Sequence, residues 1–313
     1  MAWAALSAAP AMAQDSYPSK PVKMIIGFGP GSGIDLLGRM VAEELNSTLK
    51  QPFVIENRPG ASVMLAASAV KAAAPDGYTL LLTSSTSHSV NPYVFKKLPY
   101  DPMADFTPIG SIGLFHSILA VDANLPVRTP QEFIGWAQGR KGNLFYAYSG
   151  LTFRIAAESL NRSKMLDAKG VPYKSSPEAM TDVVGGRAQF LVVDLAASQA
   201  LVKAGRLRAL AVTSARRTAV APGLPTVEES FGVRDFDMAS WVGLFGPANL
   251  PKDIVDKLSD ALQKALTRPE FRERMLANNI EPIPNEPAAF KLFLQRQLDM
   301  WKLKVAEAGV EPE

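Results

Sequence analysis

The stretch VKMIIGFGPGSGIDLLGRMVAEEL, residues 22–45, contains an apolar run, a glycine-rich turn, and a segment whose apolar residues recur at spacings of three and four. These features predict a strand, a tight turn and a helix. Ser32, with Asp35 three residues further on, predicts a capping box at the start of that helix. Free amides and the helix dipole make a helix N-terminus a favourable place for an anion, so we expect the turn to hold one.

The glycine turn does not match the fingerprints of nucleotide-binding loops. In its two possible registers, G-x-G-x-x-G would need glycine or alanine where Ser32 and Ile34 stand. Pro30 removes one amide donor, and Asp35 adds a negative charge that opposes pyrophosphate more than a single carboxylate. We therefore predict a carboxylate site. Its candidate residues in the turn are Phe28, Gly29, Pro30, Gly31, Ser32 and Gly33.

The rest of the chain alternates β-rich runs with amphipathic segments, which predicts an α/β architecture with largely parallel sheets. A length of 313 residues favours two domains. Two β-rich segments without helical period, 109–123 and 235–248, predict that the chain crosses to a second lobe and returns, which would form a hinge. The expected lobes are 17–117 with 240–313, and 118–239.

Further polar turns follow the later predicted strands. In open α/β sheets a ligand lies beyond the carboxyl ends of the strands, so these turns and the glycine turn are expected to line one crevice. The additional candidates are Ser84, Ser85, Thr86, Ser149, Gly150, Thr152 and Asp194.

Arg154 is a further candidate, in the first turn of the helix predicted after Gly150. A cation there opposes the helix dipole, so we expect it to have an anionic partner. That partner is either Glu158, four residues further on, or a ligand carboxylate. A guanidinium matches a carboxylate bidentately, so the second alternative predicts a ligand with two carboxylates, one near Arg154 and one in the glycine turn.

Composition argues against several functional classes. The net charge, 33 − 30 = +3, is too small to indicate a nucleic-acid partner. The absence of cysteine and the presence of only two histidines, His88 and His116, argue against a metal centre. We expect His88 to be a capping or surface residue and His116 a core or hinge residue. A G-x-S-x-G nucleophile elbow around Ser149 would need glycine where Ala147 stands, so this motif does not predict a catalytic serine.

The first residues resemble an export signal. Small and apolar residues run up to Ala11-Met12-Ala13, an A-x-A cleavage pattern, and the chain turns polar at Gln14. Residues 1–16 are therefore expected to be the remnant of a signal peptide, which predicts a periplasmic protein.

With these motifs in order, the chain resembles the tripartite tricarboxylate transporter substrate-binding proteins, the Bug/TctC family, from about Tyr17 to its end. The motifs that carry the resemblance are YPSKPVKMIIGFGPGSGIDLLGR, IENRPGA, PDGYTLL, TSSTSHSVNPYVFKKLPYDPMADFTPI, VPYKSSPEAMTDVVGG, AGRLRALAVTSARR, LPTVEE and WVGLFGPANLP.

The resemblance implies a type II periplasmic binding protein, with two α/β lobes joined by two hinge strands. Such a protein closes on a carboxylate and delivers it to a membrane permease of the tripartite tricarboxylate transporter type, so the resemblance implies neither catalysis nor a cofactor. In the family, the turns equivalent to the glycine turn, to 83–86 and to 149–152 hold the ligand, with help from water. We expect a monomer with no nucleic-acid partner. A sensor of the same fold that signals to a receptor kinase is the alternative, and an oxidoreductase or serine hydrolase is disfavoured by the missing fingerprints.

The chain departs from the family pattern at the ligand-facing turns. Gly31-Ser32 and Ile34 replace two adjacent glycines and a threonine, and Arg154 falls where the family has a histidine. The acid at Asp194 is shifted by one position from its commonest place. The resemblance therefore specifies the fold more firmly than the ligand.

Overall fold

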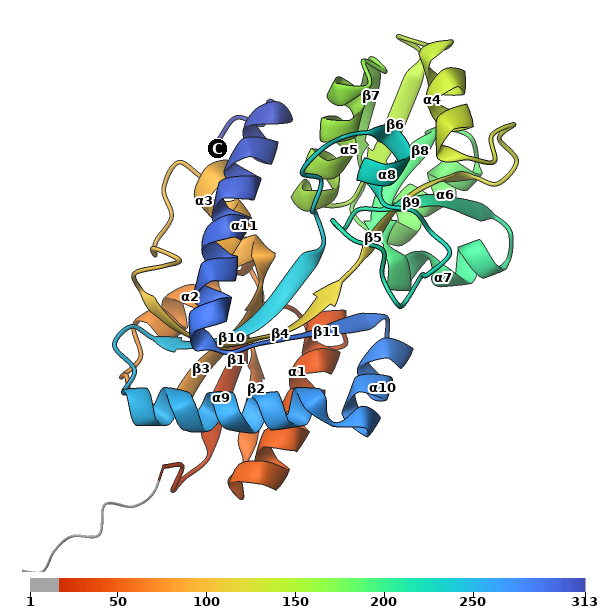
Figure 1. Ribbon diagram of the computed structural model, residues 1–313. Helices are drawn as coiled ribbons and strands as arrows, with labels where there is room; N and C mark the ends of the chain where they lie inside the picture. Colours follow the sequence, from red (N-terminus) through yellow and green to blue (C-terminus); the bar gives the residue numbers. More distant parts are fainter. Residues whose placement is uncertain (1–16, 313) are drawn as a thin grey trace, which may run out of the picture.

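The computed structural model describes residues 17–312, so the expected signal-peptide remnant lies outside the described residues. These residues form two mixed β-sheets (Figure 1). The first sheet has the order β11-β4-β10-β3-β1-β2 and the second has the order β7-β6-β8-β5-β9. The strands of the first are β1 (Val22–Ile26), β2 (Phe53–Asn57), β3 (Thr79–Ser84), β4 (Phe106–Phe115), β10 (Ser240–Pro247) and β11 (Ile280–Asn285). Those of the second are β5 (Ser117–Asp122), β6 (Leu144–Tyr148), β7 (Ala168–Pro172), β8 (Phe190–Asp194) and β9 (Leu207–Val212).

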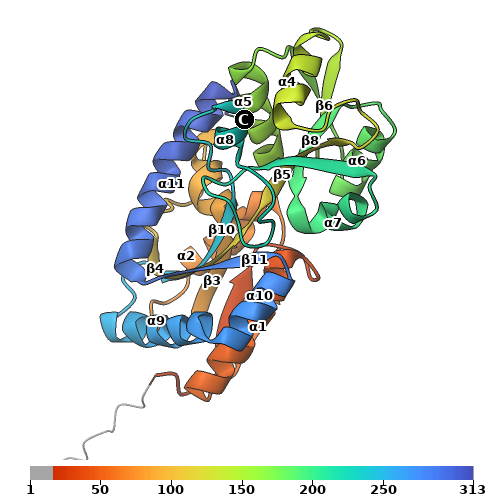
Figure 2. The same ribbon diagram turned by 45° about the vertical axis from the view of Figure 1, so that its right-hand side comes forward.

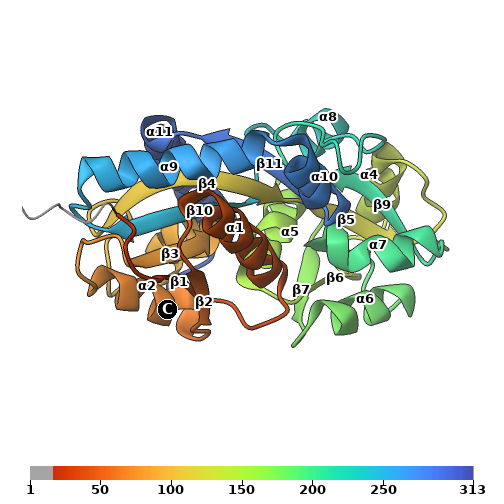
Figure 3. The ribbon, with the colours of Figure 1, turned by 90° about the horizontal axis from the view of Figure 1, so that it is seen from below.

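Helices cover both faces of each sheet. On the first sheet, α1 (Gly33–Leu49) and α9 (Lys252–Thr267) pack on one face, and α2 (Met64–Lys71) packs on the other. On the second sheet, α6 (Ser176–Val184) and α7 (Leu195–Lys203) pack opposite three helices, seen from below in Figure 3. Those three are α4 (Pro130–Gln138), α5 (Leu151–Ser163) and α8 (Val227–Phe231). Two further helices, α3 (Asn91–Val94) and α10 (Pro269–Ala277), lie beside the first sheet.

The long C-terminal helix α11 (Pro287–Glu307) joins the two cores. Its first half buries Phe290 and Leu294 against the first sheet, and its second half buries Trp301 and Val305 in the core around α5. Figure 2 shows the helix running along both lobes. Among residues 17–312, no helix combines the length and the apolar character needed to cross a bilayer.

The strand directions correct one expectation. Strands β1, β2 and β3 are parallel, and so are β6, β7 and β8. The sheets are nevertheless mixed, because β10 runs antiparallel to β3 and β4, and β5 runs antiparallel to β8 and β9. The predicted α/β class is confirmed, but the expectation of largely parallel sheets is wrong for the strands that lead into and out of the second lobe.

The chain passes from one sheet to the other around His116, between the end of β4 and the start of β5. The return strand β10 pairs with the end of β4, so both crossings lie side by side. His116 is buried, with Nδ1 at 3.2 Å from Ser214 Oγ and Nε2 at 3.0 Å from Glu281 Oε2. This confirms the prediction that His116 is a core or hinge residue. The exact lobe boundaries, 117 and 240, remain our proposal.

The start of α1 agrees with its sequence signals, with one shift. The helix buries Leu37, Val41 and Leu45 on the predicted stripe. Ser32 Oγ accepts a hydrogen bond from the Asp35 amide at 3.2 Å, as a capping box requires. The Asp35 carboxylate accepts from the Gly31 amide and not from the cap residue itself, so the reciprocal half of the box is displaced by one residue.

Candidate functional site

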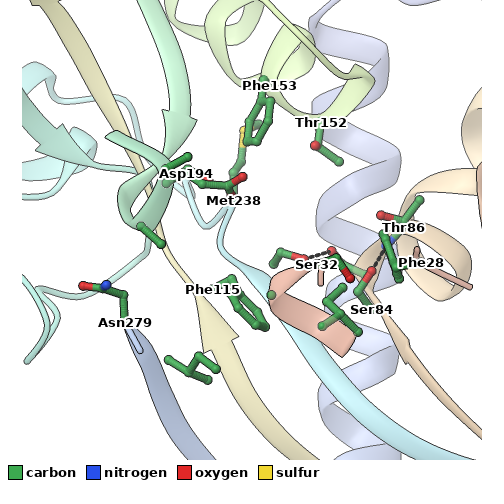
Figure 4. Close-up of a pocket in the computed structure, with 18 of the residues that line it drawn as sticks. Phe28, Ser32, Ser84, Thr86, Phe115, Thr152, Phe153, Asp194, Met238 and Asn279 are labelled. Carbon is green, nitrogen blue, oxygen red and sulfur yellow. Dashed lines mark hydrogen bonds between the residues drawn. The ribbon is translucent and has the colours of Figure 1, made fainter. Parts of the chain in front are cut away.

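A cavity of about 560 Å³ opens between the two sheets (Figure 4). The first lobe contributes the N-terminus of α1 and the end of β3, and the second lobe contributes the start of α5 and the end of β8. Eight of the predicted site residues line it: Phe28, Ser32, Gly33, Ser84, Ser85, Thr86, Thr152 and Asp194. Parts of the chain far apart in sequence therefore meet at one place, as expected for the carboxyl ends of strands in an α/β protein.

The N-terminus of α1 supplies hydrogen-bond donors to the cavity. Gly33 and Ile34 are the first two residues of the helix and both line the cavity. Their amides have no carbonyl partner within the helix, because the first amides of any α-helix lack one. The helix dipole adds partial positive charge at the same point. This end of the cavity is therefore suited to a carboxylate.

The Asp35 carboxylate holds the glycine turn in shape. It accepts hydrogen bonds from the Gly31 amide at 2.9 Å, from Asn57 Nδ2 at 2.9 Å, and from Arg39 Nε and Nη2 at 3.0 and 3.1 Å. Asn57 Nδ2 also donates to the Phe28 carbonyl at 2.9 Å. Burial alone would raise the pKa of Asp35, but the bonds from Arg39, Gly31 and Asn57 lower the pKa below its ordinary value.

The Asp35 contacts revise two expectations about the glycine turn. We expected the negative charge of Asp35 to oppose pyrophosphate more than a single carboxylate. Arg39 pairs with Asp35 and compensates that charge, so Asp35 does not discriminate between these two anions. The Gly31 amide is already bonded to Asp35, and Gly29, Pro30 and Gly31 do not line the cavity. Gly33, the last residue of the predicted turn, lines the cavity together with Ile34, which was not predicted.

Hydroxyl groups line the same side of the cavity. β3 ends at Ser84, and the segment Thr86–Val90, where the sequence predicted a polar turn, forms a π-helical turn. The Ser84 Oγ accepts from the Thr86 amide at 3.3 Å, and Ser85 Oγ lies 3.1 Å from Ser240 Oγ. These contacts place serine and threonine hydroxyls beside the N-terminus of α1 (Figure 4).

His88, in the π-helical turn, is not a capping or surface residue as predicted. It is buried, with Nδ1 at 2.8 Å from Ser87 Oγ and its ring stacked 4.2 Å from that of Phe245. Burial lowers the pKa of His88 to about 3, so the ring is neutral near pH 7. His88 does not line the cavity, and the structure gives it a packing role.

The second lobe contributes fewer of its predicted residues. Thr152 lines the cavity from the first turn of α5, and Asp194 lines it from the end of β8. Ser149 and Gly150 do not, and Ser149 Oγ lies 2.8 Å from Ser176 Oγ instead. Asp194 begins α7 without making a side-chain cap bond, and burial raises the pKa of Asp194 to about 6.

Arg154 matches neither of its expected partners in this structure. Its guanidinium carbon lies 5.9 Å from the centre of the Tyr148 ring, and it does not line the cavity. The Glu158 carboxylate accepts hydrogen bonds from Arg162 Nε at 2.9 Å and from Tyr146 Oη at 2.8 Å. The expected ion pair between Arg154 and Glu158 does not form among the described residues.

The placement of Arg154 makes a first prediction. Replacing Arg154 with alanine should change the affinity for any bound carboxylate by less than about threefold, because Arg154 does not line the cavity. The change removes its cation–π contact with Tyr148, which at a partly exposed site contributes roughly 0.5–1 kcal/mol. Titration calorimetry with a dicarboxylate and the matching monocarboxylate would measure this. A selective loss of the dicarboxylate alone would restore the interpretation of Arg154 as a second carboxylate site.

Several cavity residues carried no sequence signal for binding. Phe115, Ser117, Met238 and Ser240 belong to the two crossings, which the sequence marked only as hinge segments. The others lie on helices without a recognisable motif, or between α10 and the first residue of β11: Phe153, Ala277, Asn278, Asn279, Ile280 and Trp301. The repeated β-rich pattern at 109–123 and 235–248 could have indicated the first group, because residues at a hinge lie between both lobes.

Comparisons with known proteins cover nearly the whole chain. The sequence model of the family described as "Tripartite tricarboxylate transporter family receptor" matches residues 37–310. The UPF0065 protein of the gbd 5′ region of Cupriavidus necator is 34% identical over 308 residues, which are 97% of this chain and 93% of that protein. This similarity therefore extends over both sheets.

Two solved structures are similar in the same way. An R. palustris protein solved with adipate has 31% sequence identity and a TM-score of 0.82, over 95% of this chain and 100% of that one. MatC from Rhodopseudomonas palustris, solved with bound malate, has 29% identity and a TM-score of 0.76, over 92% and 100% of the two chains. Both overlaps confirm the two-lobed α/β fold.

Proposed function

Because the chain belongs to the tripartite tricarboxylate transporter receptor family, we propose that it captures an organic carboxylate and delivers it to a membrane permease of that transporter type. This membership confirms the resemblance that the sequence motifs predicted. The observation that carries the proposal is the N-terminus of α1, where the amides of Gly33 and Ile34 open on a cavity between the lobes.

The proposed binding mode uses both lobes. The ligand carboxylate accepts hydrogen bonds from the amides of Gly33 and Ile34 and from the hydroxyls of Ser84 and Thr86. Thr152, across the cavity, contacts the ligand from the second lobe once the lobes approach. The protein acts in the periplasm as a monomer, without a catalytic step or a cofactor.

A thermal-shift screen of mono-, di- and tricarboxylates tests the proposal. A ligand at 100 times its Kd that binds only the folded protein raises the free energy of unfolding by about 2.7 kcal/mol, which such a screen detects. The methyl esters of the same acids are the matched control, because they keep the body of the ligand and lose the charge. Stabilisation by the esters as large as by the acids would reject a carboxylate site.

Closure of the lobes makes a second prediction. A ligand held from both sides of the hinge favours the closed form, so saturation should lower the radius of gyration measured by X-ray scattering. The hinge region around His116 and the shared helix α11 would carry the movement. A radius that stays the same when calorimetry shows full occupancy would contradict closure.

The number of carboxylates on the ligand is a separate point. The adipate and malate in the two related structures are dicarboxylates, and they support a ligand with at least one carboxylate in this protein. A sensor that presents its liganded form to a receptor kinase remains the alternative function. Loss of uptake on deletion of a neighbouring permease, with ligand binding intact, would favour transport over sensing.

A further inference from the structure

We propose that the cavity selects carboxylates that carry a cationic group, such as an ammonium, beyond an apolar spacer, and that Asp194 binds this group. The inference rests on the proposed function, since it names the ligand class of the same site. It departs from the dicarboxylates of the two related structures, and the reason lies in the charges that line the cavity.

Asp194 and the N-terminus of α1 lie on opposite sides of the cavity (Figure 4). Asp194 ends β8, where it pairs with Ser117 of β5, and its backbone begins α7. The side chain makes no cap bond to that helix. In residues 17–312 the carboxylate also has no side-chain hydrogen-bond or ion-pair partner.

Asp194 is the one charged residue among those that line the cavity in the described part of the chain. Within residues 17–312, neither lysine, arginine nor histidine lines the cavity, so inside the fold Asp194 faces no full positive charge but the partial one at the N-terminus of α7. A partly buried carboxylate without a partner is costly, and an opposite charge at hydrogen-bond distance removes that cost. A ligand ammonium therefore gains a charge-assisted hydrogen bond at Asp194, whereas a second ligand carboxylate is repelled.

Apolar side chains line the cavity between its two ends. Phe115 lies below the line from Ser32 to Asp194, and Phe153 and Met238 lie above it (Figure 4). These side chains offer no strong hydrogen bond to the middle of a ligand. The cavity thus has the amides of α1 at one end, the Asp194 carboxylate at the other, and apolar side chains along the space between them, an order that matches an ω-amino acid.

Matched ligand series test the inference by titration calorimetry. The three series are the ω-amino acids from 4-aminobutanoate to 8-aminooctanoate, the monocarboxylates from butanoate to octanoate, and the dicarboxylates from succinate to suberate. At the best chain length, the ω-amino acid should bind at least about tenfold more tightly than the monocarboxylate, since a hydrogen bond to a charged group gives such a factor. The dicarboxylate should bind more weakly than both.

Variants separate the role of Asp194 from a general effect of charge. Asp194→Asn should bring the affinity ratio between the ω-amino acid and the monocarboxylate close to one. Asp122→Asn is the matched control, because Asp122 lies at the other end of β5 from Ser117 and outside the cavity, so it should leave the ratio unchanged. If Asp194→Asn does not fold, the order of the three series in the unmodified protein still decides.

The outcomes distinguish the inference from the proposed function. Equal or tighter binding of the dicarboxylates than of the ω-amino acids would overturn the role of Asp194 and leave a carboxylate receptor. A preference for ω-amino acids that persists in Asp194→Asn would also overturn it. No binding by any series, together with no stabilisation in the wider carboxylate screen, would reject the proposed function and this inference together.

Discussion

Replacing Gly33 with valine should lower the affinity for the carboxylate ligand by about ten- to a hundredfold while the protein stays folded. Gly33 is the first residue of α1 and lines the cavity, and a Cβ placed there would lie 2.9 Å from Phe115 Cε1. The valine methyl groups would therefore force the Phe115 ring to move and would cover the open amides. One lost hydrogen bond to a charged group costs about 1.5–3 kcal/mol, which corresponds to this range of affinities.

The matched control is Gly29→Ala in the same turn. A Cβ on Gly29 would meet no atom within 4 Å, and Gly29 does not line the cavity, so affinity should change less than about twofold. Gly31 is a poor site for this test, because its φ of +81° makes any side chain strained. A larger loss in Gly29→Ala than in Gly33→Val, with both variants folded, would move the anion site back to the start of the turn.

Replacing Asp35 with asparagine should destabilise the protein by about 2–3 kcal/mol, because hydrogen bonds to a buried charged group are lost. The Asp35 side chain is 4% exposed and joins the Gly31 amide to Arg39 and Asn57. Ligand affinity should fall as well, since the turn that precedes Gly33 loses its fixed shape. Chemical denaturation and calorimetry would measure the two effects separately.

Glu43→Gln on the same helix is the control for the loss of an acidic group. Glu43 pairs with Arg274 at 2.9 Å, but its side chain is 66% exposed, so the change should cost only about 0.2–1 kcal/mol. Equal losses of stability in Asp35→Asn and Glu43→Gln would contradict the structural role of Asp35.

The effect of Asp35 should also depend on pH. Because folding lowers the pKa of Asp35, its stabilisation is present above the ordinary value of 3.8 and is lost as the pH falls through the lower folded value. The gap in unfolding free energy between the unmodified protein and Asp35→Asn should therefore stay constant from about pH 7 to about pH 5 and shrink below about pH 4. A gap that grows towards acid pH would contradict the assigned ion pair.

The local signals in the sequence predicted the framework well. The buried apolar run of β1, the stripe of α1 and the cap at Ser32 all follow from local sequence. The interruption of the α/β alternation at 109–123 correctly indicated the strands between which the chain changes sheets. These features depend on neighbours in sequence, which is why they could be predicted.

The site depended on contacts that the sequence does not show. The Gly31 amide turns towards Asp35 because Arg39 and Asn57 fix that carboxylate, and Asn57 comes from a different strand. Arg154 misses the cavity because a helix turns by about 100° per residue. Thr152, Phe153 and Ala156 face the cavity, so the side chain of Arg154 projects from another side of α5.

The central claim is that a carboxylate binds between the lobes, against the N-terminus of α1. A crystal structure of the complex with the tightest acid from the carboxylate screen tests it most directly. We expect a carboxylate group within hydrogen-bond distance of the Gly33 and Ile34 amides, with the rest of the ligand contacting Thr152 in the second lobe. A ligand bound outside this cavity, or inside it with its carboxylate turned away from α1, would show that the N-terminus of α1 is not the carboxylate site.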